Sequence, residues 1–121
     1  MSLTAEEKLR RLERAIAFGG NTHTVAHVVQ AVRESRAQWW DNGEGFIVTE
    51  LEHYPLLRAC RYWLIAGELK ACLSLDEQIS QWAISEGCRV ATATGRKGWG
   101  RAGAPYGWKP HSQTFFKDLV T

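Results

Sequence analysis

Two histidines are the first residues of this chain whose types and spacing could do chemistry. His23 and His27 stand four residues apart, so on a helix they would share one face, a spacing that can bind zinc. No glutamate follows His23 to complete an H-E-x-x-H pattern, and no third ligand is evident in the sequence. His53 and His111 are isolated. We therefore predict no metal site.

Basic and aromatic residues interleave near the C-terminal end, and this pattern could bind an anion. They are Arg96, Lys97, Trp99, Arg101, Tyr106, Trp108 and Lys109. Cations beside aromatic rings can hold single-stranded nucleic acid, because its bases stack on the rings. The same residues could contact an anionic ligand or a protein partner. We favour a third interpretation, in which Trp99 and Trp108 belong to the core and the cations are solvated, so we expect no nucleic-acid partner.

The charge of the chain is unevenly distributed along its 121 residues. From Arg89 onward six basic residues face one acidic residue, whereas before it nine face twelve, for a formal net charge of +2. The C-terminal third is thus the basic end, which suits an anionic ligand. With 45% hydrophobic residues, a chain of this length can form one domain with a sizeable core.

The cysteine pattern indicates a reducing compartment. The three cysteines, Cys60, Cys72 and Cys88, are odd in number and form no C-x-x-C pair. A disulfide framework or a four-thiolate zinc site is therefore not expected, and we interpret all three as small buried hydrophobic residues. No long apolar run or signal peptide is evident. We expect a soluble, cytoplasmic protein with no membrane partner.

Two helices are predicted at the N-terminal end. Thr4 and Glu7 have the spacing of a capping box, and apolar residues at helical spacing follow until Gly19 and Gly20 end the helix. A second helix is predicted from Thr22 or Thr24 to about Arg36. Its apolar stripe consists of Val25, Val28, Val29 and Val32.

Three strands joined by short turns are predicted next. Residues 37–40 form the first, and Asn42-Gly43 is typical of a type I′ hairpin turn, which needs positive φ at both residues. Residues 46–51 alternate as a strand whose two faces differ. Tyr54-Pro55 breaks it, since proline cannot donate a ladder hydrogen bond, and residues 57–66 form the third strand. This order predicts an antiparallel meander.

A crossover helix and two further strands complete the predicted sheet. A capping-box pattern spans Ser74 to Glu77, and Ile79, Trp82 and Ala83 follow at helical spacing, which predicts a helix that begins near Ser74. The alternative is a helix that begins earlier, near Leu69, and has a kink around Ser74. We expect residues 88–94 to lie parallel to residues 57–66, because a strand–helix–strand crossover is right-handed. Residues 114–119 are predicted to join last, antiparallel. The fold class is α/β with a mixed sheet.

The order of these elements resembles the GNAT fold of the N-acetyltransferase superfamily. The chain is most similar to small GNAT-like proteins encoded by phages and prophages, over roughly residues 22–119. The landmarks that carry the resemblance are Tyr54-Pro55, Ala66-Gly67, Trp82-Ala83, Gly87-Cys88, the Gly-Arg-Lys-Gly-Trp run at 95–99, Tyr106-Gly107-Trp108 and the Phe-Lys-Asp-Leu run at 116–119. The resemblance implies one domain over residues 1–121, with an antiparallel meander, a parallel crossover strand and helices on both faces.

The resemblance also implies a site. An acyl-CoA, with acetyl-CoA as the donor, would lie between the two parallel strands. Its binding residues would be Ile65, Ala66, Gly67 and Lys70, although Glu68 stands where phosphate would sit. The candidate general bases are Glu50 and Glu52; the alternative is that both are solvent-facing strand residues. Gly103 occupies the position at which many members carry a tyrosine general acid.

Three functions remain open from the sequence. The first is an acyl-CoA-dependent N-acyltransferase. The second is a non-catalytic phage structural or assembly component that acts through contacts with other phage proteins, in the host cytoplasm or in the virion. The third is nucleic-acid binding through the basic end, which a steep salt dependence would support. The sequence leaves the substrate and the oligomeric state open.

Overall fold

A four-stranded mixed sheet forms the centre of the computed structural model, which describes residues 2–95 and 97–120. The strands follow one another across the sheet in chain order, β1 (Gln38–Asp41), β2 (Gly45–His53), β3 (Arg58–Gly67) and β4 (Val90–Ala93). The pairs β1–β2 and β2–β3 are antiparallel, and β3–β4 is parallel. The predicted meander and the predicted parallel crossover strand are therefore both confirmed.

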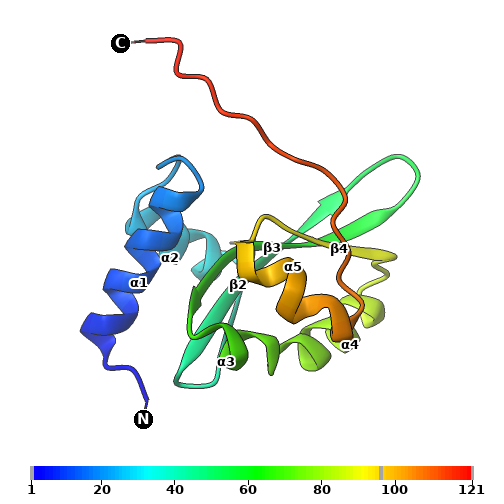
Figure 1. Ribbon diagram of the computed structural model, residues 1–121, viewed down its shortest axis with the longest axis horizontal. Helices are drawn as coiled ribbons and strands as arrows, with labels where there is room; N and C mark the ends of the chain where they lie inside the picture. The colour runs from blue at the N-terminus through cyan, green and yellow to red at the C-terminus, as the bar shows by residue number, and fades with distance from the viewer. Residues whose placement is uncertain (1, 96, 121) are drawn as a thin grey trace.

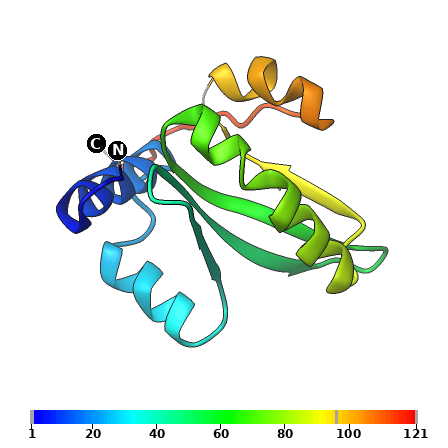
Figure 2. The same ribbon diagram turned by 90° about the horizontal axis from the view of Figure 1, so that it is seen from below.

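Helices cover both faces of this sheet (Figures 1 and 2). One face carries α1 (Ala5–Phe18) and α2 (Val25–Arg33). The other carries α3 (Leu69–Leu73), α4 (Asp76–Ser85) and α5 (Lys97–Gly103), and a 3₁₀ turn, η1 (Ala104–Tyr106), follows.

Alternation along β2 and β3 sorts their side chains into two cores. Phe46, Val48, Leu64 and Ala66 pack against α1 and α2, whereas Ile47, Cys60 and Tyr62 pack against the helices of the other face. Neighbouring strand residues point to opposite faces, so a strand covered on both sides becomes apolar throughout. Residues 45–49 of β2 are accordingly buried, residues 50–52 are half-buried, and only His53 at its far end is exposed.

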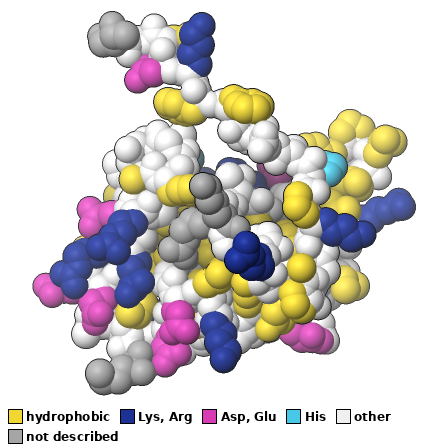
Figure 3. All heavy atoms as spheres, viewed as in Figure 1, with side chains coloured by type: hydrophobic (Ala, Val, Ile, Leu, Met, Phe, Trp, Pro, Cys, Tyr) yellow, Lys and Arg dark blue, Asp and Glu magenta, His cyan; other side chains and the backbone are white. Residues whose placement is uncertain are grey.

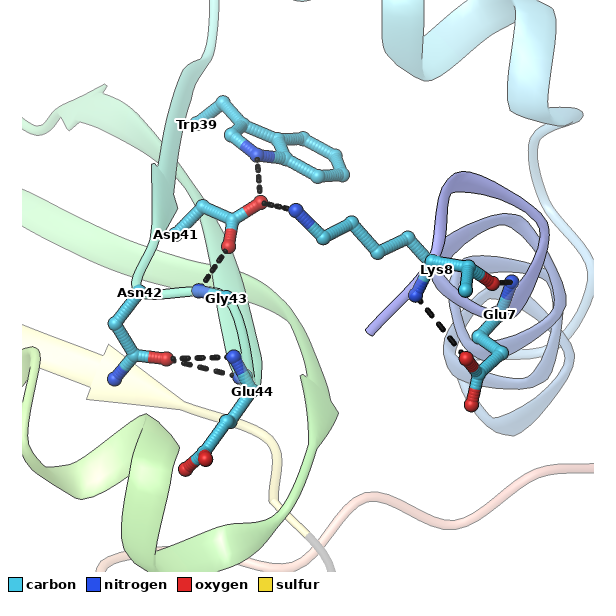
Figure 4. Close-up of polar contacts among 9 residues, drawn as sticks. Glu7, Lys8, Trp39, Asp41, Asn42, Gly43 and Glu44 are labelled. Atoms are coloured by element: carbon cyan, nitrogen blue, oxygen red, sulfur yellow. Dashed lines mark hydrogen bonds and ion pairs between the residues drawn. The ribbon is translucent and has the colours of Figure 1, made fainter. Parts of the chain in front are cut away.

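A carboxylate ties α1 to the tip of the first hairpin (Figure 4). Asp41 accepts hydrogen bonds from Lys8 Nζ at 2.8 Å, from Trp39 Nε1 at 3.1 Å and from the Gly43 amide at 2.7 Å. At the N-terminus of α1, Thr4 and Glu7 form the predicted capping box. The first helix therefore docks through a polar clamp as well as through its apolar stripe.

The predicted type I′ turn at Asn42-Gly43 is wrong. Gly43 has a positive φ of 92°, but Asn42 does not, and the loop between β1 and β2 has three residues. The Asn42 side-chain oxygen accepts the amides of Glu44 and Gly45 at 3.1 and 3.0 Å, as Figure 4 shows. Asparagine thus closes the loop by bonding to the backbone two and three residues ahead, a contact that pattern reading does not reveal.

The crossover segment is two helices, as the alternative with a kink around Ser74 predicted. The predicted capping box is wrong, however, since the N-cap of α4 is Leu75, which makes no side-chain cap, and Ser74 Oγ donates to Ala71 O at 2.6 Å. Ser74 is instead the C-cap of α3. Trp82, on the stripe of α4, is half-buried and packs edge-on against Trp40 at 5.4 Å between ring centroids.

The predicted last strand over residues 114–119 is wrong. These residues form no strand and all are exposed, and Figure 3 shows hydrophobic side chains on this segment. Phe115 and Phe116 are 87% and 79% exposed. Because the two rings are adjacent in the chain, a strand would turn them to opposite faces, and an edge position beside β4 has no helix to cover both. No helix within residues 2–95 and 97–120 is long and apolar enough to cross a membrane.

Candidate functional site

The two parallel strands separate soon after they begin to pair. The ladder between β3 and β4 runs only from Ala59↔Val90 to Tyr62↔Ala93, whereas β3 continues to Gly67. On the side that faces β4, residues 63–66 of β3 therefore have no ladder partner among the described residues. Backbone N–H and C=O groups left without a partner are strong sites for a hydrogen-bonding ligand.

A cavity of about 350 Å³ lies where the strands separate. Its walls come from the C-terminal half of α1 and the segment that follows it, from β3, from Thr94 and Gly95 after β4, and from Thr114 of the C-terminal tail. This volume is at the lower end of the range for small-molecule sites. A smaller cavity of about 210 Å³ shares His23 and Trp63 with the first.

Three of the four residues predicted to bind a cofactor line the larger cavity. These are Ile65, Ala66 and Gly67, whereas Lys70 in α3 is not part of its wall. Gly67 has a φ of +99°, and a Cβ there would lie 2.6 Å from the Glu44 carbonyl oxygen. The glycine is thus required by the close approach of two loops. Since α3 has only five residues, this loop does not form the phosphate cradle that the resemblance implies.

The two predicted general bases lie in different places. Glu50 pairs with Arg61 across β2 and β3, with 2.6 Å between Oε1 and Nη1, and it lines the smaller cavity. Glu52 is further along the hairpin and lines neither cavity. There it accepts a hydrogen bond from Tyr54, which raises the pKa of that phenol. Glu50 stays a candidate because of its position, and its carboxylate is already engaged by a cation.

His23 is the candidate site residue that sequence reasoning missed as a base. It lines both cavities, and its ring packs edge-on against Trp63 with 4.8 Å between centroids. Its Nδ1 lies 2.7 Å from the Thr22 hydroxyl oxygen, and Nε2 has no hydrogen-bond partner among the described residues. In the tautomer whose Nδ1–H donates to Thr22, Nε2 keeps a lone pair and can accept a proton.

His27 is used elsewhere, although its spacing from His23 first suggested a metal. Its Nδ1 accepts the Thr24 amide at 2.9 Å, which completes the cap of α2. Within residues 2–95 and 97–120 no three His, Cys, Asp or Glu side chains come together as a metal site. The sequence signal for His23 was its spacing from His27, which pointed to a metal and gave no indication of a base.

A buried aromatic cluster closes the opposite face of the sheet. The Tyr62 hydroxyl donates to Asp76 Oδ1 at 2.7 Å, and Trp108 Nε1 donates to the same oxygen at 3.2 Å. Burial and the bond to Asp76 raise the pKa of Tyr62. Trp99 packs against both rings and is 6% exposed, so the prediction that Trp99 is core is confirmed.

The same cluster explains the glycine at the expected tyrosine position. A Cβ on Gly103 would lie 3.1 Å from the Trp108 side chain, so a larger residue there would push against that ring. Tyr106 is 52% exposed and lines neither cavity. Among the described residues, no tyrosine hydroxyl faces the cavity between the strands.

Comparison with known proteins identifies the fold. No protein-family model matches the chain, and a search of curated proteins finds no match. Solved structures do match over nearly their whole length. An acetyltransferase of Trypanosoma brucei gives a TM-score of 0.65 at 11% identity, covering 98% of this chain and 97% of that one. A probable acetyltransferase gives 0.63 at 11% identity over 100% and 96%.

A transcriptional regulator of Bacillus halodurans is equally similar, with a TM-score of 0.67 at 12% identity over 98% of this chain and 97% of that one. Identities this low show the fold alone, and proteins of different named roles share it. The chain therefore has the GNAT-like fold: a mixed sheet with an antiparallel meander, one parallel pair and helices on both faces.

Proposed function

We propose that the chain is an N-acyltransferase that uses an acyl thioester, with acyl-CoA as the donor. The observation that carries this proposal is the separation of β3 from β4 beside a cavity, since it leaves a strand edge available to an extended ligand. Bound acyl-CoA would supply an activated acyl group: the acceptor nitrogen forms the new C–N bond, the C–S bond breaks and the nitrogen loses a proton.

The residues of the cavity wall suit the extended acyl-thioester arm of acyl-CoA better than its phosphate groups. Ile65 and Ala66 offer an apolar wall to an extended acyl-thioester arm, and Ile65 lies beyond the ladder between β3 and β4. The loop at residues 67–70 lacks a helix long enough to hold a diphosphate, and Glu68 would repel one. We therefore expect weak affinity for acetyl-CoA, with a dissociation constant of about 1 mM or more.

His23 is the proposed proton acceptor. It lies at the wall of the cavity with Nε2 available, and its ring contacts Trp63 and the Thr22 hydroxyl. Glu50 is the alternative acceptor, because it lines the adjoining cavity with His23.

Filling the cavity tests the proposal. Thr94 lines the cavity and is exposed, so Thr94→Trp should occlude the gap and lower acetyl transfer at least about tenfold while the fold persists. Thr92→Trp is the matched control, since Thr92 is also exposed but lies in the paired part of β4. Product would be measured by mass spectrometry with acetyl-CoA and a panel of amines. Equal transfer by the two variants, or none by the wild type, would reject this function.

A second function is favoured by the C-terminal tail. Phe115, Phe116, Leu119 and Val120 are 79% exposed or more. Exposed apolar side chains gathered on one segment are typical of a protein contact. A non-catalytic component that binds other phage proteins through this tail is therefore our alternative. Two results together would favour this alternative. The double variant Phe115→Ser/Phe116→Ser would no longer bind a purified partner that the wild type binds, and the wild type would show no detectable acyl transfer.

A further inference from the structure

The charged residues that line the larger cavity are all cations. Arg11 and Arg14 come from α1 and Arg61 from β3, and no Asp or Glu is among the described residues of the wall. The rest of the wall is largely apolar and includes Phe18 and Trp63. A cleft lined by charges of one sign, with low-dielectric walls, focuses their electric field on a bound ligand.

Two of the three guanidinium groups are available to a ligand. Arg61 is neutralised by Glu50, with which it pairs at 2.6 Å. The side chains of Arg11 and Arg14 form no hydrogen bond or ion pair with another described residue. Glu7, one turn before Arg11, is engaged at the cap, where its carboxylate accepts the Thr4 amide at 3.1 Å.

Arg11 and Arg14 also share one face of their helix. Residues three apart on a helix are neighbours, and both line the cavity. Guanidinium groups present N–H donors in a planar fork that matches a carboxylate or a phosphate. An oxyanion could therefore be held at the α1 wall, opposite the edge of β3.

This charge pattern selects among amine acceptors. A nearby cation disfavours a second positive charge, so the cavity lowers the pKa of a bound ammonium group and favours the neutral, nucleophilic amine. The same field repels polyamines and lysine-rich peptides. Binding energy must then come from another part of the acceptor.

We propose that the acceptor is a small primary amine that also carries a carboxylate or a phosphate, and that Arg11 and Arg14 hold this anionic group. This inference rests on the proposed acyl transfer for its catalytic meaning, but the anion site exists without it. The apolar wall favours an acceptor with an apolar or aromatic part, and the volume favours a free small molecule.

Matched acceptors test this directly. Phenylalanine would be compared with phenethylamine, which lacks only the carboxylate, phosphoethanolamine with ethanolamine, and spermidine would represent polycations. We expect kcat/KM to be at least about tenfold higher for the anionic member of a pair and lowest for spermidine. The pair that shows the larger ratio tells whether carboxylate or phosphate is preferred. Equal use within both pairs, or preference for spermidine, would overturn the proposal.

Arginine variants assign the effect to the cavity. Arg11→Gln and Arg14→Gln should each reduce the ratio within a pair several-fold, whereas Arg10→Gln, on the same helix but outside the wall, should leave it unchanged. Each measurement would be repeated with the acetyl thioester of N-acetylcysteamine, a donor without phosphates. If the two variants raise KM only for acetyl-CoA, the arginines bind the donor's phosphates and the proposal is wrong.

A binding measurement separates this inference from the proposed function. Calorimetry with phenylalanine and phosphoethanolamine, in the absence of donor, should show binding that Arg14→Gln weakens and Arg10→Gln does not. That result without any acyl transfer would support the anion site and reject the enzyme. No binding of either ligand at millimolar concentration would reject the anion site, whether or not transfer to other amines occurs.

Discussion

At the scale of the residue, position 23 shows how packing turns an ordinary side chain into a candidate for chemistry. The His23 ring lies on Trp63, its Nδ1 is beside the Thr22 hydroxyl and its other nitrogen is available at the cavity. His27, only one turn along, caps a helix. The two residues are alike in the sequence and differ in what surrounds them.

Replacing His23 tests its role as a base. His23→Gln should lower kcat about a hundredfold or more, because proton acceptance is lost. His27→Gln is the control: glutamine can keep the cap, so transfer and stability should stay near the wild type. A His23→Gln variant with wild-type kcat would show that Glu50 or solvent takes the proton.

Another single atom is predicted to matter for stability. The Tyr62 hydroxyl donates to Asp76, which is 5% exposed, so Tyr62→Phe removes a donor from a buried carboxylate. We expect a loss of about 2 kcal/mol in the free energy of unfolding, measured by denaturant titration. Tyr106→Phe, at an exposed tyrosine, should cost less than about 0.5 kcal/mol. Equal costs would mean that the bond to Asp76 contributes nothing.

At the scale of the element, α1 is attached to the sheet by charge as well as by apolar contact. Partial burial alone would raise the pKa of Asp41, but hydrogen bonds from Lys8, Gly43 and Trp39 and the charge of Lys8 outweigh it. The pKa of Asp41 therefore lies below its ordinary value of 3.8. Since α1 also supplies one wall of the cavity, this clamp helps to position that wall.

The sign of this shift predicts a pH dependence. A carboxyl group with a lowered folded pKa stabilises the protein fully above its unfolded pKa, and the contribution disappears as pH falls through the folded value. Asp41→Asn should therefore lower the free energy of unfolding by about 0.5–1 kcal/mol at pH 7. The difference from the wild type should shrink as the pH falls from 5 to about 2. A difference independent of pH would show that the clamp acts through shape rather than charge.

At the scale of the whole molecule, the C-terminal tail stands apart from an otherwise packed fold. The aromatic cluster of Tyr62, Trp99 and Trp108 holds the chain until residue 108, and beyond it every described residue is exposed. Phe116 approaches the loop after α1, since a Cβ on Gly20 would lie 3.6 Å from its ring. Thr114 reaches the cavity wall, so the tail passes along the site without being part of the core.

Polar substitution in the tail tests this arrangement. Phe115→Ser/Phe116→Ser should change the free energy of unfolding by less than about 0.5 kcal/mol per residue, because both rings are exposed. Denaturant titration would measure it, with Phe46→Ala, in the core, as the contrast. A loss of about 3 kcal/mol or more would mean that the tail packs as the strand that the sequence predicts.

Local patterns were enough to determine the two N-terminal helices, the crossover helices, the meander and the parallel strand, because apolar periodicity and chain connectivity decide them within short segments. The assignment of Ile65, Ala66 and Gly67 to the gap came from the resemblance to the GNAT fold and not from local pattern. The tertiary structure alone decided the rest. The conformation of the Asn42 loop depends on hydrogen bonds to a side chain. Pairing of the tail depends on whether another element covers both Phe115 and Phe116. The cationic cavity depends on the approach of α1 to β3. Arg11 and Arg61 are fifty residues apart in the chain, and no local pattern encodes that they share a wall.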